Sequence, residues 1–125
     1  MNVGNWVGKR ALLYPERPFL KEDDQEWNNR QFDARVNRTA HALLELGVGK
    51  ETRVAVLMAN SSAFLEIFFA CAKLGAVIVL LNTSLALPEL AHIVEDCAPR
   101  LLVYSSDALA KVAHLKTVPG VRFHG

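Results

Sequence analysis

Three apolar runs of strand length, separated by segments with helical periodicity, constrain the fold more than any other feature of this sequence. The runs are Val54–Met58, Ala76–Leu81 and Leu101–Tyr104. A continuous apolar run is expected where both faces of a strand are covered, as in a parallel sheet. The alternation of strand and helix from Arg53 onward therefore predicts an α/β fold, a layered parallel sheet with right-handed βαβ crossovers.

An amphipathic helix is predicted before the first of these runs. Asn28 is expected to cap it, because Gln31 stands three residues later, at the spacing of a capping box. Gly47 is expected to end it, since glycine tolerates the left-handed conformation that often follows a helix. The side chains expected on its buried face are those of Phe32, Val36, Ala40, Leu43 and Leu44.

Helices are also predicted between and after the strand-length runs. The first of them is expected to begin within 60–62 and to end at Gly75. Apolar residues surround almost its whole circumference, so we expect it to be buried on several sides. Another is expected from Pro88 to about Ala98, because proline favours the first turn of a helix. A weaker helix is predicted over 107–115.

Both ends of the chain carry weaker patterns. Two prolines within 12–20 favour a turn-like segment over a long helix there. A short strand around Phe19–Lys21 is expected to turn at Glu22–Asp24 and to return through Glu26–Trp27. Residues 117–125 show no pattern, so this tail is expected to be poorly structured.

Composition excludes several functional classes. Apolar residues make up 51% of the chain, which argues against disorder. The 14 basic and 13 acidic residues form no block, so no nucleic-acid partner is expected. Cys71 and Cys97 are isolated, and we interpret them as reduced thiols of a cytoplasmic protein. Glu66 and Lys73 interrupt the only long apolar stretch, Phe64–Leu81, so no transmembrane segment is expected.

The stretch Gly47-Val48-Gly49-Lys50 resembles a phosphate-binding loop only superficially. Such a loop needs a further glycine five residues before the second one, where this chain has Leu44. Glu51 follows the lysine, where a magnesium-binding hydroxyl is required. The stretch also leaves a helix C-terminus, whose partial negative charge repels phosphate. We interpret it as a helix stop followed by a polar turn.

Two polar trios are the main candidates for ligand contacts. Asn60-Ser61-Ser62 and Asn82-Thr83-Ser84 each follow a predicted strand. They would lie at the carboxyl edge of the sheet, where open α/β sheets bind ligands. The first trio also opens a helix, a position that favours anions. The alternative is that both trios only cap a helix and shape a turn, which are the usual roles of such residues.

The remaining polar and aromatic groups form no coherent reactive set. Glu95 and Asp96 point in different directions around a helix, which makes them a weak acid–base pair and favours a solvated face. A cluster of phenylalanines on the second helix would suit either the floor of an acyl pocket or plain core; it comprises Phe64, Phe68 and Phe69. The histidines lack a partner at triad or metal spacing; they are His41, His92, His114 and His124. No catalytic, cofactor-binding or metal-binding residue is therefore assigned in this chain.

The order of the segments resembles the N-terminal portion of the adenylate-forming, or AMP-binding, superfamily, and within it the fatty-acyl-CoA synthetases. The resemblance covers residues 11–106 and depends on ordered landmarks. These are Gly47-Val48 after a helix, Asn60-Ser61 opening the next, Lys73-Leu74-Gly75-Ala76-Val77 closing it, Asn82 in a turn, and Glu89-Leu90 in the following helix.

The departures from the family pattern affect turns and caps. Asn28-Asn29 stands where Thr-Tyr is usual, and Lys50-Glu51-Thr52-Arg53 stands where Lys-Gly-Asp-Arg is common. Leu80 replaces a frequent proline. These changes leave the predicted fold intact but blur the subfamily.

The resemblance implies a two-step ligase reaction for a longer parent protein. A fatty or other carboxylic acid would attack ATP in the presence of Mg²⁺ to give an acyl-adenylate and pyrophosphate, and CoA would then displace AMP. The family's phosphate loop, Ser/Thr-Gly-Thr-Thr-Gly-x-Pro-Lys-Gly, lies downstream of the region that this chain matches. Residues 1–125 are therefore expected to be an incomplete N-terminal segment, inactive alone and without a cofactor of its own.

A second hypothesis is a non-catalytic α/β binding or interaction module that kept the layered fold. A reading frame that continued into a Gly/Thr-rich loop ending in Pro-Lys-Gly would favour the ligase. An independent small enzyme is disfavoured, because the chain lacks a coherent nucleophile, base or metal cluster.

Isolated, the chain is expected to associate with itself or with the remainder of the parent enzyme, because the helix over 64–74 is apolar on nearly every side. Sedimentation should show species larger than the monomer, and an apolar dye should bind. A stable monomer that binds no dye would contradict this expectation.

Overall fold

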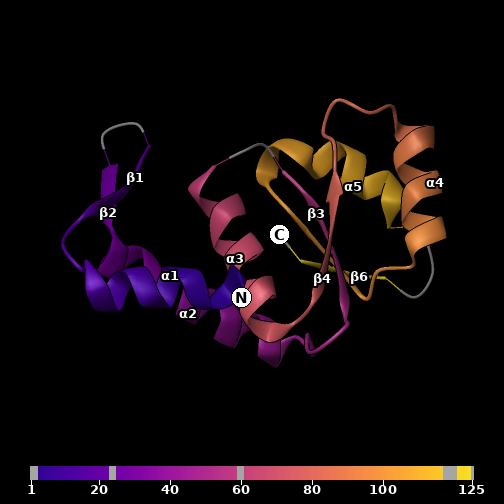
Figure 1. The fold of residues 1–125 in the computed structure, drawn as a ribbon. Coiled ribbons are helices and arrows are strands. Elements are labelled where there is room, and N and C mark those ends of the chain that lie inside the picture. The colour runs from indigo at the N-terminus through magenta and orange to yellow at the C-terminus, as the bar shows by residue number, and fades with distance from the viewer. Residues whose placement is uncertain (1–2, 23–24, 59–60, 117–120, 125) are drawn as a thin grey trace. The chain divides into compact units, whose positions relative to one another are not determined.

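The computed structural model describes residues 3–22, 25–58, 61–116 and 121–124 (Figure 1). The chain forms two compact units, residues 1–50 with 60–76 and residues 51–59 with 77–125. The elements are α1 (Val3–Leu13), β1 (Pro18–Glu22), β2 (Gln25–Asn28), α2 (Asn29–Glu45), β3 (Arg53–Leu57), α3 (Ser62–Leu74), β4 (Val77–Leu81), α4 (Leu87–Cys97), β5 (Leu101–Tyr104), the 3₁₀ turn η1 (Ser106–Ala108), α5 (Leu109–Leu115) and β6 (Arg122–His124).

The second unit is built on a four-stranded sheet with the strand order β4-β3-β5-β6. Its three strand pairs are all parallel. Ala55 in β3 lies opposite Val79 in β4 and Leu102 in β5, so the three apolar runs are in register. This confirms the predicted α/β class and the parallel pairing of the first two runs.

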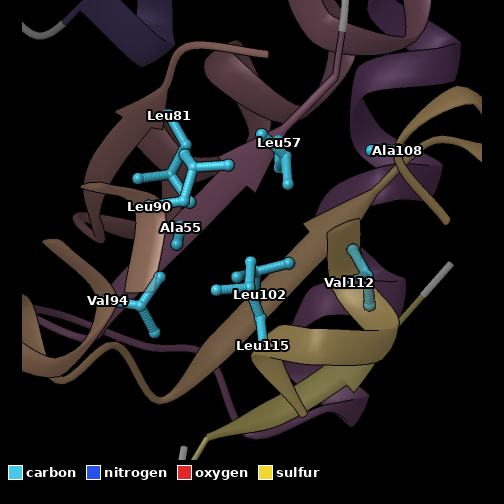
Figure 2. Close-up of a cluster of buried hydrophobic side chains, with 9 residues drawn as sticks. All are labelled: Ala55, Leu57, Leu81, Leu90, Val94, Leu102, Ala108, Val112 and Leu115. Atoms are coloured by element: carbon cyan, nitrogen blue, oxygen red, sulfur yellow. The ribbon is translucent and has the colours of Figure 1, made fainter. Parts of the chain in front are cut away.

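One face of this sheet packs against α4 and α5 (Figure 2). Alternate strand residues point toward the two helices, as the period of two along a strand requires. Fully burying one such leucine or valine contributes about 1.5–3 kcal/mol. The cluster comprises Ala55, Leu57, Leu81, Leu90, Val94, Leu102, Ala108, Val112 and Leu115.

Strand β4 is less buried than the sequence predicts. Val77 and Leu80 are 47% and 57% exposed, whereas Leu81 is only 5% exposed. The expectation that 76–81 forms a buried strand was therefore wrong for two of its side chains. The physical reason is position, because β4 lies at the edge of the described sheet and has a neighbouring strand on one side only.

The tail also departs from expectation. Residues 122–124 form β6, which pairs with β5 so that Leu102 lies opposite Phe123. The expected lack of regular structure was therefore wrong for this segment, while 117–120 and 125 lie outside the described residues. Three residues are too few to show a periodicity. The strand forms because its backbone pairs with that of β5, and the side-chain pattern does not reveal this pairing.

In the first unit, α2 has the predicted ends. The side-chain oxygen of Asn28 accepts a hydrogen bond from the Gln31 amide at 2.8 Å, and the Gln31 side chain accepts one from the Asn28 amide at 3.0 Å. The capping box is thus confirmed. Gly47 has a φ of 90°, and the Val48 amide donates to the Leu43 carbonyl at 3.0 Å.

The buried face of α2 is as predicted except at one position. Phe32, Val36, Ala40 and Leu43 are buried, but Leu44 is 51% exposed. Successive residues point about 100° apart around a helix, so Leu43 and Leu44 do not share one narrow face. Leu44 was wrongly included.

Charged side chains join α3 to α2. Lys73 donates to Asp33 Oδ1 at 3.0 Å and to Asn37 Oδ1 at 2.5 Å. Arg35 Nη2 lies 2.5 Å from Glu66 Oε1, and both side chains are mostly buried. The two charges that interrupt the apolar stretch are therefore paired. Apart from the exposed Ala63, every residue of α3 is buried or half-buried, as the apolar circumference predicts.

Helix α1 was not predicted. It includes 12–13, which were expected to be turn-like, and it ends before Pro15. Gly4 and Gly8 lower its intrinsic helix propensity, so tertiary contacts stabilise it. Val7 is buried, and the ring of Trp6 stacks on that of Phe69 at a centroid distance of 6.0 Å.

The other predicted elements are confirmed within the described residues. β1 and β2 pair antiparallel, with Leu20 opposite Trp27. Glu22 belongs to β1, and positions 23 and 24 of the expected turn lie outside the described residues. Helix α3 ends at Gly75 with a φ of 71°, and α4 carries Pro88 in its first turn. The weaker helix appears as η1 followed by α5.

Replacing Leu90 by alanine should lower the free energy of unfolding by about 2–5 kcal/mol, because this fully buried side chain leaves a cavity beneath the sheet. Leu109→Ala is the matched control, since Leu109 is 54% exposed and should change stability by at most about 0.5 kcal/mol. Urea unfolding measures the free-energy change of both variants, provided that the dependence of the unfolding free energy on urea concentration (the m-value) stays constant. Equal losses in the two variants would contradict the described core.

Candidate functional site at the carboxyl edge of the sheet

Three parallel strands of the second unit end together at one edge. Leu57 of β3 lies opposite Leu81 of β4 and Tyr104 of β5. The Ser105 amide donates to the Leu57 carbonyl at 3.3 Å and so extends the ladder by one residue. Ligands in open α/β sheets bind beyond this edge, which makes it the candidate site.

The connection after β4 is a turn shaped by Asn82. Its side-chain oxygen accepts hydrogen bonds from the amide and the hydroxyl of Ser84, at 2.9 and 2.7 Å. The Leu85 amide donates to the Asn82 carbonyl at 3.1 Å. The structure therefore places the trio Asn82-Thr83-Ser84 at the predicted edge, and Asn82 performs the turn-shaping role that was the alternative interpretation.

Sequence reasoning missed the partners of this turn. The ammonium group of Lys111, in the first turn of α5, donates to the Thr83 carbonyl and, at 3.1 Å, to the Leu85 carbonyl. The Ser105 hydroxyl donates to the carboxylate of Asp107 in the connection after β5. Lys111 lies 28 and 26 positions from the two residues whose carbonyls it contacts, and no local spacing in the sequence links it to the turn.

The other polar trio belongs to the first unit. The Ser61 hydroxyl accepts a hydrogen bond from the Phe64 amide at 3.3 Å and caps α3. Ser62 is buried, and Asn60 lies outside the described residues. Ser61 thus performs the capping role expected of such residues, and it occupies one of the free amides at this helix N-terminus.

The stretch Gly47–Lys50 is a helix stop, as predicted. It follows α2 and precedes β3, so it faces a helix C-terminus. Glu51 takes a positive φ of 65°, which marks a tight turn. The chain therefore offers no phosphate cradle here.

The remaining candidates lie apart from the edge or serve as core. His41, His92 and His114 are exposed, as are Glu95 and Asp96. The side chain of His124 lies outside the described set. Phe69 packs edge-on against Phe32 and Phe68, at centroid distances of 6.1 and 5.3 Å, which is aromatic packing within the first unit. A role for these rings in an acyl pocket stays a prediction.

An open parallel sheet with a polar turn at its carboxyl edge is the arrangement in which α/β proteins commonly bind ligands beyond their strand ends. The sequence profile of the AMP-binding enzyme family matches residues 7–123. The chain belongs to this family.

Known proteins of this family resemble the chain closely. Long-chain-fatty-acid–CoA ligase FadD13 of Mycobacterium tuberculosis is 38% identical over 107 residues, which cover 84% of this chain and 21% of that protein. Feruloyl-CoA synthase of an Amycolatopsis species is 34% identical over 113 residues, covering 90% and 23%. A solved Mycobacterium tuberculosis fatty acyl CoA synthetase has a TM-score of 0.90 at 32% identity, covering 98% of this chain and 26% of that chain.

The chain spans about a fifth of the length of these curated relatives. Its fold matches part of the N-terminal domain of adenylate-forming enzymes, as the resemblance predicted, and covers 33% of one solved domain of this kind. None of the described helices has the length and apolarity that a membrane span needs.

Within the described ranges, the residues do not form a complete ATP–Mg²⁺ or CoA site. In the described part of the chain, no three His, Cys, Asp or Glu side chains are grouped to hold a metal ion. The polar atoms of Asn82 and Lys111 are bonded to the chain itself.

Cys71 should be far less reactive than Cys97. Burial raises the pKa of the Cys71 thiol from 9.0 to about 11, so its thiolate fraction near pH 8 falls roughly a hundredfold. Cys97 is only half-buried. Iodoacetamide should therefore label the folded chain at Cys97 first, and both cysteines equally in guanidinium; equal rates in the folded chain would contradict this.

The same shift predicts a loss of stability at high pH. The folded state holds the Cys71 proton more tightly than the unfolded state does, so the stability from this site is complete below pH 9 and falls as the pH rises toward 11.

Proposed function

We propose that this chain is the N-terminal part of an ATP-dependent carboxylic acid–CoA ligase that acts through an acyl-adenylate. The observation that carries the proposal is the match of the AMP-binding enzyme family over residues 7–123. The names of the relatives agree in chemistry, since a long-chain-fatty-acid–CoA ligase and a feruloyl-CoA synthase both join a carboxylic acid to CoA. A fatty acid or another carboxylic acid with an apolar tail is the proposed substrate.

The proposed reaction needs groups that residues 1–125 do not supply. Developing negative charge on a transferring phosphate must be stabilised by preorganised donors, commonly a lysine and a glycine-rich loop, together with Mg²⁺. The sequence holds no Gly/Thr-rich loop that ends in Pro-Lys-Gly. We therefore propose that this chain supplies a scaffold and one wall of the site, while the rest of the enzyme supplies the reactive groups.

The proposal includes a cytoplasmic location and three small-molecule partners, ATP with Mg²⁺, CoA and the acid. The location is supported by the two cysteines, which are both free. It also agrees with a reaction that consumes ATP and CoA.

A chimera tests the ligase assignment. This chain would replace the matching segment of the mycobacterial long-chain-fatty-acid–CoA ligase, with the intact ligase and a deletion of that segment as controls. Carboxylate-dependent ATP–pyrophosphate exchange should be present in the chimera and in the intact ligase. It should be absent in the deletion and in the 125-residue chain alone.

Each arm of this experiment can contradict the proposal. Exchange by the chain alone would overturn its predicted inactivity. A chimera that unfolds cooperatively, as the intact ligase does, but forms no acyl-adenylate would contradict the ligase assignment and favour the binding-module hypothesis.

A further inference from the structure

The strongest unexplained feature of the second unit is the environment of Lys111. Its half-buried ammonium group contacts two backbone carbonyls, those of Thr83 and Leu85. In the described part of the chain, no carboxylate lies within ion-pair distance of it. A lysine charge is seldom buried without a carboxylate unless its hydrogen bonds perform a specific task.

The position of this contact in the sheet suggests the task. Thr83 and Leu85 lie in the connection after β4, and Lys111 lies in the helix after β5. Strand β3 runs between β4 and β5. The lysine therefore ties together two connections on either side of the carboxyl end of β3, at the edge where this fold binds ligands.

The contact adds to local bonds that do not fix the turn by themselves. Asn82 organises the turn internally through Ser84 and Leu85. Those bonds determine the shape of the turn but not its position over the sheet. Leu85 packs against the buried apolar cluster, and Lys111 adds charge-assisted hydrogen bonds from α5, which are about twice as strong as neutral ones.

We infer that Lys111 is a positioning residue, which holds the turn over 82–86 against the sheet so that one wall of the ligase site is formed before substrate binds. The inference rests on the proposed function for the identity of that site. If the turn is already ordered, ligand binding does not have to offset the conformational entropy lost on ordering it. Loss of the anchor should therefore weaken binding of the substrate that contacts the turn and leave the chemical step intact.

The contact itself is tested by amide hydrogen exchange on the 125-residue chain. Lys111→Met keeps the apolar stem and removes the donors, and exchange at the Ser84 and Leu85 amides should accelerate roughly tenfold. Lys111→Arg should restore protection, because a guanidinium group can donate to both carbonyls. Lys116→Met is the matched control at the C-terminal end of the same helix, since Lys116 is exposed. Unchanged exchange in Lys111→Met would overturn the contact.

The positioning role is tested by kinetics in the protein as its gene encodes it. In Lys111→Met, the KM for one of ATP, acid or CoA should rise roughly tenfold while kcat stays within about twofold. Lys111→Arg and Lys116→Met should behave like the wild type. Unchanged KM values in Lys111→Met would overturn the positioning role. A fall in kcat at unchanged KM, accompanied by a smaller folded fraction of the variant, would also overturn it, because the loss would then reflect unfolding. A wild type without ligase activity would instead contradict the proposed function, and the exchange rates would still report whether Lys111 holds the turn.

Discussion

The parallel pairing of β3 with β4 and β5 is the constraint on which the second unit depends. β3 is apolar throughout its buried length, and Val54, Ala55, Val56 and Leu57 are each at most 1% exposed. A strand buried on both faces needs neighbours on both edges, because its amide and carbonyl groups are out of reach of water. Parallel neighbours in turn require long crossovers, and in this chain α3 joins β3 to β4, α4 joins β4 to β5, and α5 joins β5 to β6. The sheet, the helical layer and the edge where the strands end all follow from this one strand.

In the first unit the main constraint is different: helix α3 is apolar on nearly all sides and must be buried. Helix α3 packs against α1 and α2, and its two charged residues are neutralised by partners on α2. Mostly buried pairs of this kind contribute little net stability, because desolvation offsets much of their attraction. Their geometry is directional, however, so Lys73 and Glu66 fix which face of α3 meets α2.

Much of this architecture could be predicted because local sequence determined it. Some patterns extend over only a few residues, and each indicates a single structural feature. They are the capping box of Asn28 and Gln31, the left-handed Gly47 and Gly75, and the apolar run of β3. The features that were missed depend on distant partners. Helix α1 contains two glycines and is stabilised by tertiary packing, β6 is a three-residue strand paired through its backbone, and the exposure of Leu80 follows from its place in an edge strand.

At the candidate site, too, the locally determined feature could be predicted and the feature that depends on a distant partner could not. The sequence placed Asn82 at the carboxyl edge, because a polar turn after a buried strand has only one location in a parallel sheet. It gave no sign of Lys111, whose contacts span 26 to 28 residues. The parallel sheet itself is most directly tested by amide-to-amide nuclear Overhauser effects in the folded chain. The parallel sheet should give cross-strand contacts in the register that sets Ala55 opposite both Val79 and Leu102, whereas contacts in antiparallel order, or none between these strands, would contradict it.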